Sequence, residues 1–503
     1  MAQKGRRIIV IYYLSQGRES NFTFGSLVNI FDDDDSFEVH KFNFAQDDLD
    51  SLDGIFANSD VIFLHYSLLY QRVRPRILDF FRPLESLRNS KAFKIAMPQD
   101  EGAFPGLLDD LLVYWDIDLL VSVHFSEQEK LYPNARHTLD TVSVLPAFVK
   151  REWLRSVPPI KKLSDRSLGL AYRGRASMWR HGRANFIKSE FSLKLASIFE
   201  DAGWETDVSI AGVDRIYGDA WRKFIESARL VYGSPGGYTA IDYYGELNRQ
   251  VTQVLANNQP SNFEEFNQLM PQGWDSANLL TITSRHFEAA YYGTPQILYE
   301  SDYKGVIKPN LHYVPVSTNI ETLDDLMPLL NDDDYLISTV EAFRKDAFKE
   351  QFTFEELKSQ FKHIIDSSIG GAKSQPLVNQ HVLSLKEHAD ARLQVISDAR
   401  VESTQSSKSL PDFLIGRAKV RRGGQLVRNK SSVYARYLLI RLFVFFRRLF
   451  FHTRRVFRRI GMLMKKIIRK SRLLMLKVIR RSYYISRRVA IDSVKFVLSF
   501  IRK

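Results

Sequence analysis

The chain has 503 residues, a length that predicts two or three domains. Apolar residues make up 45% of it, enough for ordinary hydrophobic cores, and the absence of Cys excludes disulfides and Cys-based zinc sites and suits a cytoplasmic protein. The net charge of +13 is unevenly distributed, because residues 417–503 hold 27 of the 71 Lys and Arg residues but one of the 58 Asp and Glu residues. We therefore expect a mildly acidic body joined to a strongly basic tail, as separate functional units.

The first 152 residues alternate apolar runs with helical stretches. The N-terminal sequence MAQKGRRIIVIYYL turns polar without a small-residue cleavage pattern, so it predicts a first strand rather than a signal peptide. Further candidate strands are FEVHKFNF, DVIFLHY, FKIAMP, DLLVSV and TVSVLP, most of them nearly continuous apolar runs. Such runs are typical of parallel strands covered on both faces. We therefore predict an α/β domain with a parallel sheet over residues 1–152.

A second α/β series follows a polar segment. Residues 155–167, RSVPPIKKLSDRS, contain Pro-Pro and predict an interdomain linker. Residues 167–370 then repeat the pattern, with the strands SLGLAYRGR, ETDVSI and ARLVYGS, and close with an amphipathic helix over 353–369. Two tandem Rossmann-like domains predict a cleft between them, and ligands of such sheets bind beyond the carboxyl ends of the strands.

Two loops that follow strands of the second domain have the composition of phosphate or sugar sites. Arg173 and Arg175 lie in YRGRASMWRHGR, where glycines and arginines precede a helix, a combination that suits a phosphate. Gly236 and Gly237 lie in VYGSPGGYTAID, where glycine lets the backbone approach a ligand closely. The alternatives are a solvated basic loop for the first and a tight structural turn for the second.

The stretch SRHFEAAYYGTPQILYES, residues 284–301, predicts a helix, a tight turn and a buried strand. Arg285 and Glu288 are three positions apart and share one face of the helix. Gly293 ends the helix, as glycine commonly does. Such a Glu can accept hydrogen bonds from two ribose hydroxyls, and such an Arg can bind a diphosphate. The alternative is a surface ion pair.

These blocks occur in an order that resembles a known family. The succession YRGR, DRIYGDAW, GSPGGYTAIDYYGE, SRHFEAAYYGTP and YKGVIKPNLHYVP is similar to the donor half of GT-B glycosyltransferases. It most resembles a bacterial group associated with cell-surface polysaccharides of the capsule or O-antigen type. The resemblance covers roughly residues 60–365. It implies a GT-B fold and a nucleotide-sugar donor, with no cofactor and no essential metal.

The resemblance also implies roles for single residues. Glu288 would bind the nucleotide ribose, while Arg173 and Arg175 would face the diphosphate with Arg285 nearby. Gly293 and Thr294 would line the nucleotide pocket, and Glu300 and Tyr303 would lie at its edge. Many retaining members carry a second acid eight positions before the ribose Glu, where this chain has Leu280. Inversion and retention both stay open.

The first domain is expected to supply the acceptor site and any catalytic base. His65 follows the third predicted strand, and Asp100 and Glu101 follow the fourth, in FKIAMPQDEGAF. Similar Q-D-E residues occur at this point in the resembling group, and a carboxylate here could deprotonate an acceptor hydroxyl. We prefer Asp100 as the base, with Glu101 and His65 next. The alternatives are a core-edge imidazole for His65 and a loop N-cap for Asp100.

Two acid clusters, FDDDDSFE and NDDDY, could be mistaken for metal-binding motifs. Both lie in predicted turns between elements, which favours solvated loops. We therefore predict no metal site in this chain.

The end of the chain has a different composition. Residues 371–435 predict a linker with one possible helix, and residues 436–503 predict basic amphipathic helices in which paired cations recur at steps of 4, 7 and 11. Phe, Leu and Ile occupy the opposite face, which favours an anionic membrane surface. A partner helix and nucleic acid are the less favoured alternatives. No run of 18 uncharged apolar residues predicts a transmembrane helix.

The working hypothesis is a glycosyltransferase at the cytoplasmic face of the cell membrane, to which it binds peripherally. It would move a sugar from a nucleotide-sugar to a cell-surface glycan, with a lipid-linked acceptor favoured. One alternative is a transferase for a protein or small-molecule acceptor. The other is a non-catalytic GT-B-like protein that binds a nucleotide or scaffolds a glycan-assembly complex.

Overall fold

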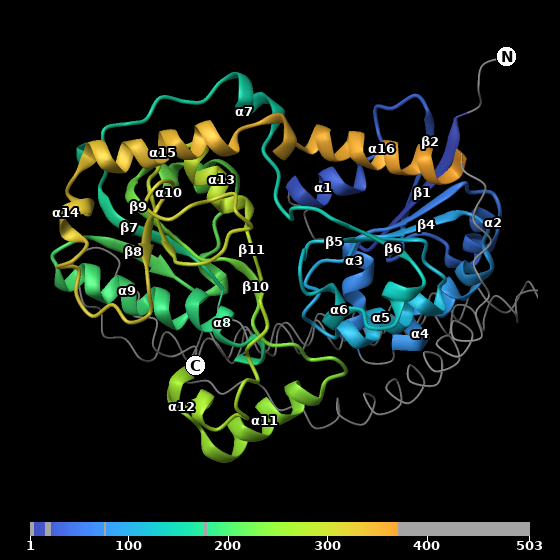
Figure 1. Ribbon diagram of the computed structural model, residues 1–503, viewed down its shortest axis with the longest axis horizontal. Helices are drawn as coiled ribbons and strands as arrows, with labels where there is room; N and C mark the ends of the chain where they lie inside the picture. The colour runs from blue at the N-terminus through green and yellow to red at the C-terminus, as the bar shows by residue number, and fades with distance from the viewer. Residues whose placement is uncertain (1–4, 16–21, 75–76, 176–178, 371–503) are drawn as a thin grey trace, which may run out of the picture. The chain divides into compact units, whose positions relative to one another are not determined.

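The computed structural model describes residues 5–15, 22–74, 77–175 and 179–370 (Figure 1). These residues belong to one compact unit of the chain, 1–418. They form a six-stranded and a five-stranded parallel sheet, so the predicted succession of two α/β domains is confirmed. The basic tail and its preceding linker lie outside the described residues. Within the described part, no helix is both long and apolar enough to cross a membrane.

The first sheet has the order β2-β1-β3-β4-β5-β6, and all of its neighbouring strands are parallel. Its strands are β1 (Arg6–Tyr12), β2 (Phe37–Asn43), β3 (Val61–Leu64), β4 (Phe93–Ala96), β5 (Leu119–Ser122) and β6 (Asp140–Ser143). Every residue of β3 and β5 is buried, because helices cover both faces of the sheet. The strand order reverses at β1, which is the position where open α/β sheets bind ligands.

The helices of the first domain are mostly short. They are α1 (Phe22–Val28), α2 (Leu52–Ala57), α3 (Tyr66–Leu69), α4 (Ile77–Phe81), α5 (Pro105–Tyr114), α6 (Gln128–Leu131) and α7 (Arg151–Arg155). α5 is buried from Pro105 to Val113, so it lies in the interior rather than on the surface.

The second sheet has the order β13-β12-β9-β7-β8, again with parallel neighbours. Its strands are β7 (Leu168–Arg173), β8 (Thr206–Ser209), β9 (Ala228–Gly233), β12 (Gln296–Tyr299) and β13 (Val314–Val316). A separate antiparallel pair joins β10 (Gly236–Tyr238) to β11 (Leu279–Thr281). The helices of the second domain are α8 (Arg183–Lys188), α9 (Glu190–Asp201), α10 (Gly218–Glu226), α11 (Glu246–Asn258), α12 (Phe263–Gln268), α13 (Ser284–Tyr291), α14 (Met327–Leu330) and α15 (Asp333–Ala347).

One helix differs from the sequence prediction in its partner. α16 (Phe354–Gly370), which we assigned to the second domain, packs on the first sheet (Figure 1). Leu357, Phe361 and Ile365 belong to the same buried cluster as residues of β1, β3 and β4. The Phe361 ring lies 5.7 Å from the Phe63 ring. An amphipathic pattern shows that a helix buries one face but does not show against which sheet.

The segment from β10 to α11 joins the second domain to the first. Tyr238 and Leu279 belong to the buried core cluster of the first domain. The Tyr244 hydroxyl donates to Asp110 Oδ2 at 3.2 Å. A Cβ on Gly106 would lie 2.6 Å from the Tyr244 ring, so only glycine admits this approach. The contacts bring the loops at the carboxyl end of β4 close to the second domain.

Candidate functional site

The carboxyl ends of the strands carry most of the predicted site residues, as parallel α/β sheets lead one to expect. In the second domain, α10 and α13 both begin at this edge, since each helix leads into the amino end of the next strand. Thr283 caps α13 together with His286, which places the first turn of that helix firmly. Arg285 and Glu288 project from this anchored turn and the one after it.

Glu288 is held in place by a tryptophan of α10. The Trp221 Nε1 donates to Glu288 Oε2 at 2.7 Å. The other carboxylate oxygen, Oε1, accepts no hydrogen bond from any residue that the structure describes. Glu288 is partly buried, so a fixed acceptor with one open oxygen faces the site. Such an oxygen can bind a hydroxyl of a ligand.

Arg173 and Arg285 lie together but differ in what they contact. The Arg173 guanidinium donates to Asp207 Oδ2 at 2.7 Å and lies 4.3 Å from the centre of the Phe224 ring. Arg285 is exposed, donates to the carbonyl of Arg173, and lies over the Trp221 ring at 5.4 Å. The Arg173 guanidinium is therefore engaged by Asp207 and Phe224, and the Arg173 carbonyl accepts a hydrogen bond from Arg285. Arg285 is exposed and is the cation of the two that is open to a ligand.

Arg175 is the second exposed cation at this edge. It lies two residues beyond the end of β7 and is exposed. Burial lowers the pKa of His181 to about 3, and the positive charges of Arg180, Lys188 and Arg175 lower it further.

Gly236 and Gly237 form β10 and pair with β11. Gly237 has φ +91°, and a Cβ there would lie 1.8 Å from the Leu279 carbonyl oxygen, so the position requires glycine. The Gly237 carbonyl accepts a hydrogen bond from Lys188 Nζ at 3.3 Å. The glycine pair therefore builds a tight antiparallel ladder with β11, beside a lysine that the sequence did not single out.

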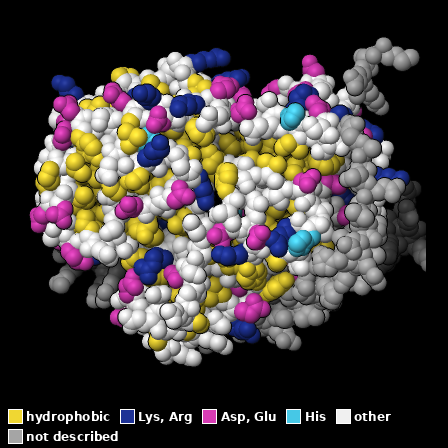
Figure 2. All heavy atoms as spheres, in the orientation of Figure 1, with side chains coloured by type: hydrophobic (Ala, Val, Ile, Leu, Met, Phe, Trp, Pro, Cys, Tyr) yellow, Lys and Arg dark blue, Asp and Glu magenta, His cyan; other side chains and the backbone are white. Residues whose placement is uncertain are grey.

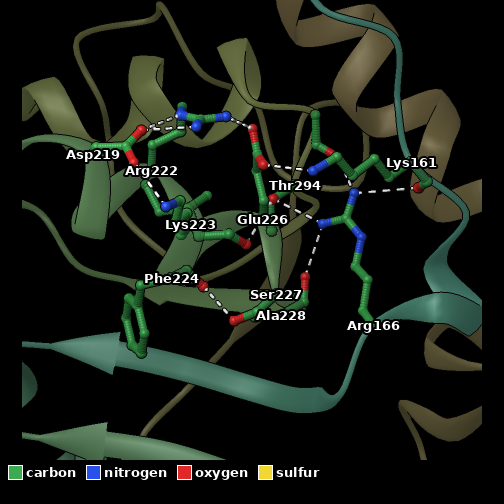
Figure 3. A network of polar contacts seen from close by, with 12 residues as sticks. Lys161, Arg166, Asp219, Arg222, Lys223, Phe224, Glu226, Ser227, Ala228 and Thr294 are labelled. Atoms are coloured by element: carbon green, nitrogen blue, oxygen red, sulfur yellow. Dashed lines mark hydrogen bonds and ion pairs between the residues drawn. The ribbon is translucent and has the colours of Figure 1, made fainter.

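Gly293 and Thr294 lie elsewhere. Figure 3 shows Thr294 in a network with Arg166, whose Nη1 donates to Thr294 Oγ1 and to the Ala228 carbonyl, both at 2.8 Å. Ala228 begins β9 and Thr294 precedes β12, so this is the amino edge of the sheet. The structure therefore does not bring Gly293 and Thr294 together with Arg285. Arg285 lies in the first turn of α13, at the carboxyl edge of the sheet, whereas Gly293 and Thr294 follow the end of this helix, at the amino edge.

The network of Figure 3 explains why these two residues are buried. Arg166 Nη2 donates to the Gly293 carbonyl at 2.8 Å, and Thr294 Oγ1 donates to the Ile225 carbonyl at 3.0 Å. Lys161 of the linker pairs with Glu226 at 2.6 Å. These contacts anchor the interdomain linker to the second domain.

Glu300 and Tyr303 follow β12 and have different surroundings. Glu300 is exposed at the carboxyl end of the strand, on the same edge as Arg285. Tyr303 is fully buried, and its hydroxyl donates to the Tyr299 carbonyl at 2.7 Å. Glu300 is therefore available at the site, whereas Tyr303 belongs to the core beneath it.

In the first domain, Asp100 lies on a constrained loop after β4. Asp100 is exposed and has φ +53°, in the left-handed region that Asp tolerates better than most residues. Phe104, with φ +54°, shares that conformation four residues later. Arg72 is fully buried and donates to the carbonyls of Asp100 at 2.8 Å and Ala103 at 3.0 Å. Arg72 therefore holds the loop in a conformation that costs backbone energy.

Glu101 faces the interior. Its carboxylate is fully buried and accepts hydrogen bonds from Ser122 Oγ and the Val123 amide, both at 2.8 Å, and from the Tyr132 hydroxyl. Burial raises the pKa of Glu101 to about 7, although these three donors oppose the shift. Glu101 fastens the β4 loop to β5, and its oxygens are already occupied.

His65 is fully buried and caps α3. Its Nδ1 lies 2.8 Å from Ser67 Oγ and accepts from the Ser67 amide at 3.2 Å. Burial lowers its pKa to about 3, so the ring is neutral. His65 thus matches the alternative of a core-edge imidazole that supports the neighbouring Tyr66.

Charges from the two domains converge near Asp100. Burial lowers the pKa of Lys188 in the second domain to about 8 and that of His124 in the first to about 4, and the Asp100 charge opposes both shifts. Lys304, which follows β12 in the second domain, lowers the pKa of His124. The carboxyl edges of the two sheets therefore lie within electrostatic reach of each other. An exposed carboxylate on one side and several cations on the other suit an anionic ligand that must be positioned next to a proton acceptor.

The acid clusters do not form a metal site among the residues that the structure describes, where no group of three or more metal-ligating side chains occurs. Asp32, Asp33 and Asp34 lie within ion-pair distance of lysines: Lys41, Lys358 and Lys362, respectively. Asp332 accepts from the Tyr335 amide at 2.9 Å and caps α15. Both clusters thus have structural roles.

Three residues of the candidate site carry no sequence signal that predicts their role: Trp221, Lys188 and Arg72. Trp221 lies in DRIYGDAW, a block whose only signal is its place in the order of blocks. Arg72 and Lys188 lie in helical stretches with no distinguishing pattern. Their significance depends on the burial of a cation, which one sequence does not reveal.

Comparison with known proteins gives distant similarities. No family model and no curated protein matches the chain. Among solved structures, sucrose-phosphate synthase from Thermosynechococcus elongatus aligns with a TM-score of 0.40 at 10% identity over 73% of this chain and 100% of its own. HepE from Anabaena, in complex with UDP and glucose, aligns at 0.37 and 10% over 72% and 100%. AviGT4, a glycosyltransferase of avilamycin A biosynthesis, aligns at 0.36 and 11% over 73% and 99%. Since all three TM-scores are below 0.5, no conclusion about this chain rests on them.

Proposed function

We propose that the protein is a glycosyltransferase that takes a sugar from a nucleotide-sugar donor held by the second domain. The observation that carries the proposal is the pair formed by Glu288, fixed by Trp221, and the exposed Arg285 at the carboxyl edge of the second sheet. An oriented carboxylate suits the ribose hydroxyls, and an open guanidinium suits the diphosphate. Arg175 and Glu300 border the same edge.

The first domain supplies the acceptor side of this proposal. Asp100 is exposed on a loop that Arg72 and Glu101 hold rigidly, so it can act as the proton acceptor. The acceptor hydroxyl gives its proton to Asp100 and bonds to the anomeric carbon. The bond from that carbon to the diphosphate oxygen breaks, and the nucleoside diphosphate leaves with the electron pair. The transfer step needs no oxidant and no reductant.

The acceptor and the location belong to the same proposal. A lipid-linked glycan of the cell surface is the acceptor class that accounts for both an apolar, basic tail at 436–503 and a transferase body. The enzyme would then act at the cytoplasmic face of the membrane and bind it peripherally. On the face drawn in Figure 2, acidic and basic side chains of the described residues are interspersed. The excess of Lys and Arg in residues 417–503 makes the tail the expected source of membrane attraction.

A thermal-shift screen tests the proposal. We expect nucleoside diphosphates and nucleotide-sugars of one base to raise Tm, since a ligand at 100 times its Kd stabilises the fold by about 2.7 kcal/mol. The base that stabilises most then identifies the donor for an assay of sugar transfer to glycolipid extracts. A protein that binds nucleotides but transfers or releases no sugar would instead be the non-catalytic scaffold. No stabilisation by any nucleotide would contradict both.

A further inference from the structure

An apolar cavity of about 220 Å³ lies at the carboxyl edge of the first sheet, where α16 begins. One wall is formed by residues that follow β5 and β6, and the other by η8 (Glu350–Phe352) and the first turns of α16. The larger apolar side chains of the lining are Phe125, Val144, Leu145, Phe148, Phe352 and Leu357. Since an apolar cavity of about 150 Å³ takes up benzene, this one has room for a stretch of hydrocarbon chain.

The polar side chains of the lining are largely engaged by their own neighbours. Ser143 Oγ accepts from Gln128 Nε2 at 2.8 Å. Thr353 Oγ1 accepts from the Glu356 amide at 3.2 Å, and Gln360 Nε2 donates to Glu356 Oε1 at 3.2 Å. A peptide segment in this cavity would therefore lose hydrogen bonds to water and find few replacements. A hydrocarbon chain has no hydrogen bonds to lose, so it is the occupant that the lining suits.

Hydrogen bonds connect the wall of the cavity with the loop that carries Asp100. Ser143 Oγ donates to the His124 carbonyl at 3.3 Å, and the His124 amide donates to Ser122 Oγ at 3.0 Å. Ser122 Oγ donates in turn to Glu101 Oε2 at 2.8 Å, and Glu101 follows Asp100 in the chain. β6 lies two strands from β4, a separation of about 10 Å. One sugar unit with its phosphate linkage has this length scale.

We propose that the cavity binds the first part of the hydrocarbon chain of a lipid-linked acceptor, whose glycan end extends along the sheet edge to Asp100. This inference rests on the proposed function and adds to it the site that recognises the lipid. Phe125, which is 49% exposed, offers its ring to the entering chain. The enzyme then prefers acceptors with a hydrocarbon chain close to the reacting sugar over free sugars.

Calorimetry with octyl β-D-glucoside and methyl β-D-glucoside, below the concentration at which micelles form, tests the cavity in the full chain. We expect the octyl compound to bind at least 100-fold more tightly, since each buried methylene contributes about fourfold. Phe125→Ser should lower this ratio at least tenfold, because it removes part of the apolar wall. The matched control is Leu269→Ser, which removes a 43% exposed apolar side chain after α12 and should keep the wild-type ratio. Equal Tm values show that both variants are folded.

A transfer assay identifies the source of the chain. With the donor found by the screen and a glycolipid extract as acceptor, octyl glucoside should inhibit transfer by wild type and by Leu269→Ser. Phe125→Ser should require at least tenfold more of it for the same inhibition. Octyl glucoside that binds through Phe125 without slowing transfer would show that the cavity holds some other lipid, and this result would overturn the inference.

The outcomes separate the inference from the proposed function. If the enzyme transfers sugar to the extract but Phe125→Ser keeps the wild-type ratio of octyl to methyl glucoside affinity, the inference is overturned and the proposed function stands. If no sugar is transferred or released from any donor, the proposed function fails. The inference then fails with it, even where Phe125-dependent binding of octyl glucoside persists.

Discussion

Asp100 and Glu101 are neighbours in the chain, but their carboxylates have opposite surroundings. Asp100 is exposed on a left-handed residue, whereas Glu101 is fully buried among three hydrogen-bond donors. The loop conformation produces this difference, because the residue at φ +53° turns the next side chain towards β5. One carboxylate is thereby available for chemistry and the other for holding the loop.

Asp100→Asn tests the first of these roles. We expect nucleotide affinity to be preserved and turnover to fall by roughly 10²–10⁴, since a general base contributes about this much. Asn tolerates the left-handed region as well as Asp does, so the loop should keep its conformation. Asp116→Asn is the matched control, because Asp116 is also exposed with a φ of +57°. Full activity in Asp100→Asn would assign the base elsewhere.

Glu288→Gln tests the donor side. Replacing the charged acceptor by an amide should weaken nucleotide binding by roughly tenfold or more, since a hydrogen bond to a charged group contributes about 1.5–3 kcal/mol. Calorimetric titration with the diphosphate measures the loss. Glu264→Gln, which removes an exposed partner of Arg183, should leave affinity unchanged. Equal affinities for Glu288→Gln and wild type would exclude Glu288 from the site.

Glu101 gives the stability a characteristic pH dependence. Its pKa rises from 4.5 to about 7 on folding, so in this window the folded protein binds a proton that the unfolded chain has released. Stability therefore falls as the pH rises from about 4.5 to 7, by about 1.4 kcal/mol for each pKa unit. We expect the Tm of Glu101→Gln, relative to wild type, to be higher at pH 8 than at pH 5. A pH-independent difference would contradict the raised pKa.

At the scale of elements, α13 and the β10–β11 pair contribute different groups to the candidate site. α13 presents Arg285 from its capped first turn and Glu288 from its second, while Gly293 and Thr294, which follow the helix, are buried at the opposite edge of the sheet. The β10–β11 ladder supplies the carbonyl that Lys188 contacts, and it depends on Gly237. We therefore expect substitutions at the positions that fix these elements to weaken ligand binding without removing a ligand contact.

Gly237→Ala should show this dependence. The added Cβ would meet the Leu279 carbonyl oxygen at 1.8 Å, so the ladder must separate. Gly203→Ala is the matched control, since Gly203 has a similar φ of +86° with open space around it. We expect the control to cost about 1–2 kcal/mol of stability from backbone strain alone, and Gly237→Ala to cost more and also to weaken nucleotide binding. Chemical denaturation and calorimetry measure the two effects. Equal costs would show that the β10–β11 ladder adjusts freely.

At the scale of the whole molecule, the chain crosses from the first domain to the second and then returns. Arg166 anchors the outward linker to the amino edge of the second sheet, and α16 covers the first sheet on the way back. Lys362 Nζ donates to Ser36 Oγ at 2.5 Å, which ties α16 to the turn before β2. Residues 1–152 alone therefore lack a helix that their core requires.

The basic tail is expected to act separately from this body. Deleting residues 436–503 should release the protein from anionic vesicles while nucleotide binding persists, because both described sheets and the candidate site lie within residues 5–370. Each cation near an anionic surface contributes about 1 kcal/mol, and burial of the apolar face adds to it. Salt should weaken but not abolish the binding of the full chain.

Co-sedimentation of both proteins with neutral and anionic vesicles, at low and high salt, measures this. Equal binding of the truncated protein, or equal binding to neutral lipid, would contradict a membrane role for the tail. Salt-sensitive binding to nucleic acid without binding to vesicles would favour the alternative.

The sequence by itself determined the two α/β domains with their parallel sheets, and it predicts a site at the carboxyl edge of each sheet. Continuous apolar runs, helical periodicity and glycine positions are local properties, and parallel sheets place all their strand ends at predictable edges. The same logic correctly brought Arg285, Glu288, Asp100 and Glu300 to those edges.

Only the tertiary structure decided which of the candidates are open and which are engaged. Arg173 is bound to Asp207, Glu101 and His65 are buried, and Gly293 and Thr294 lie at the far edge. It also decided that α16 serves the first domain. These outcomes depend on burial and on contacts between residues far apart in the chain, and a sequence pattern carries neither the dielectric surroundings of a charge nor the partner of an amphipathic face.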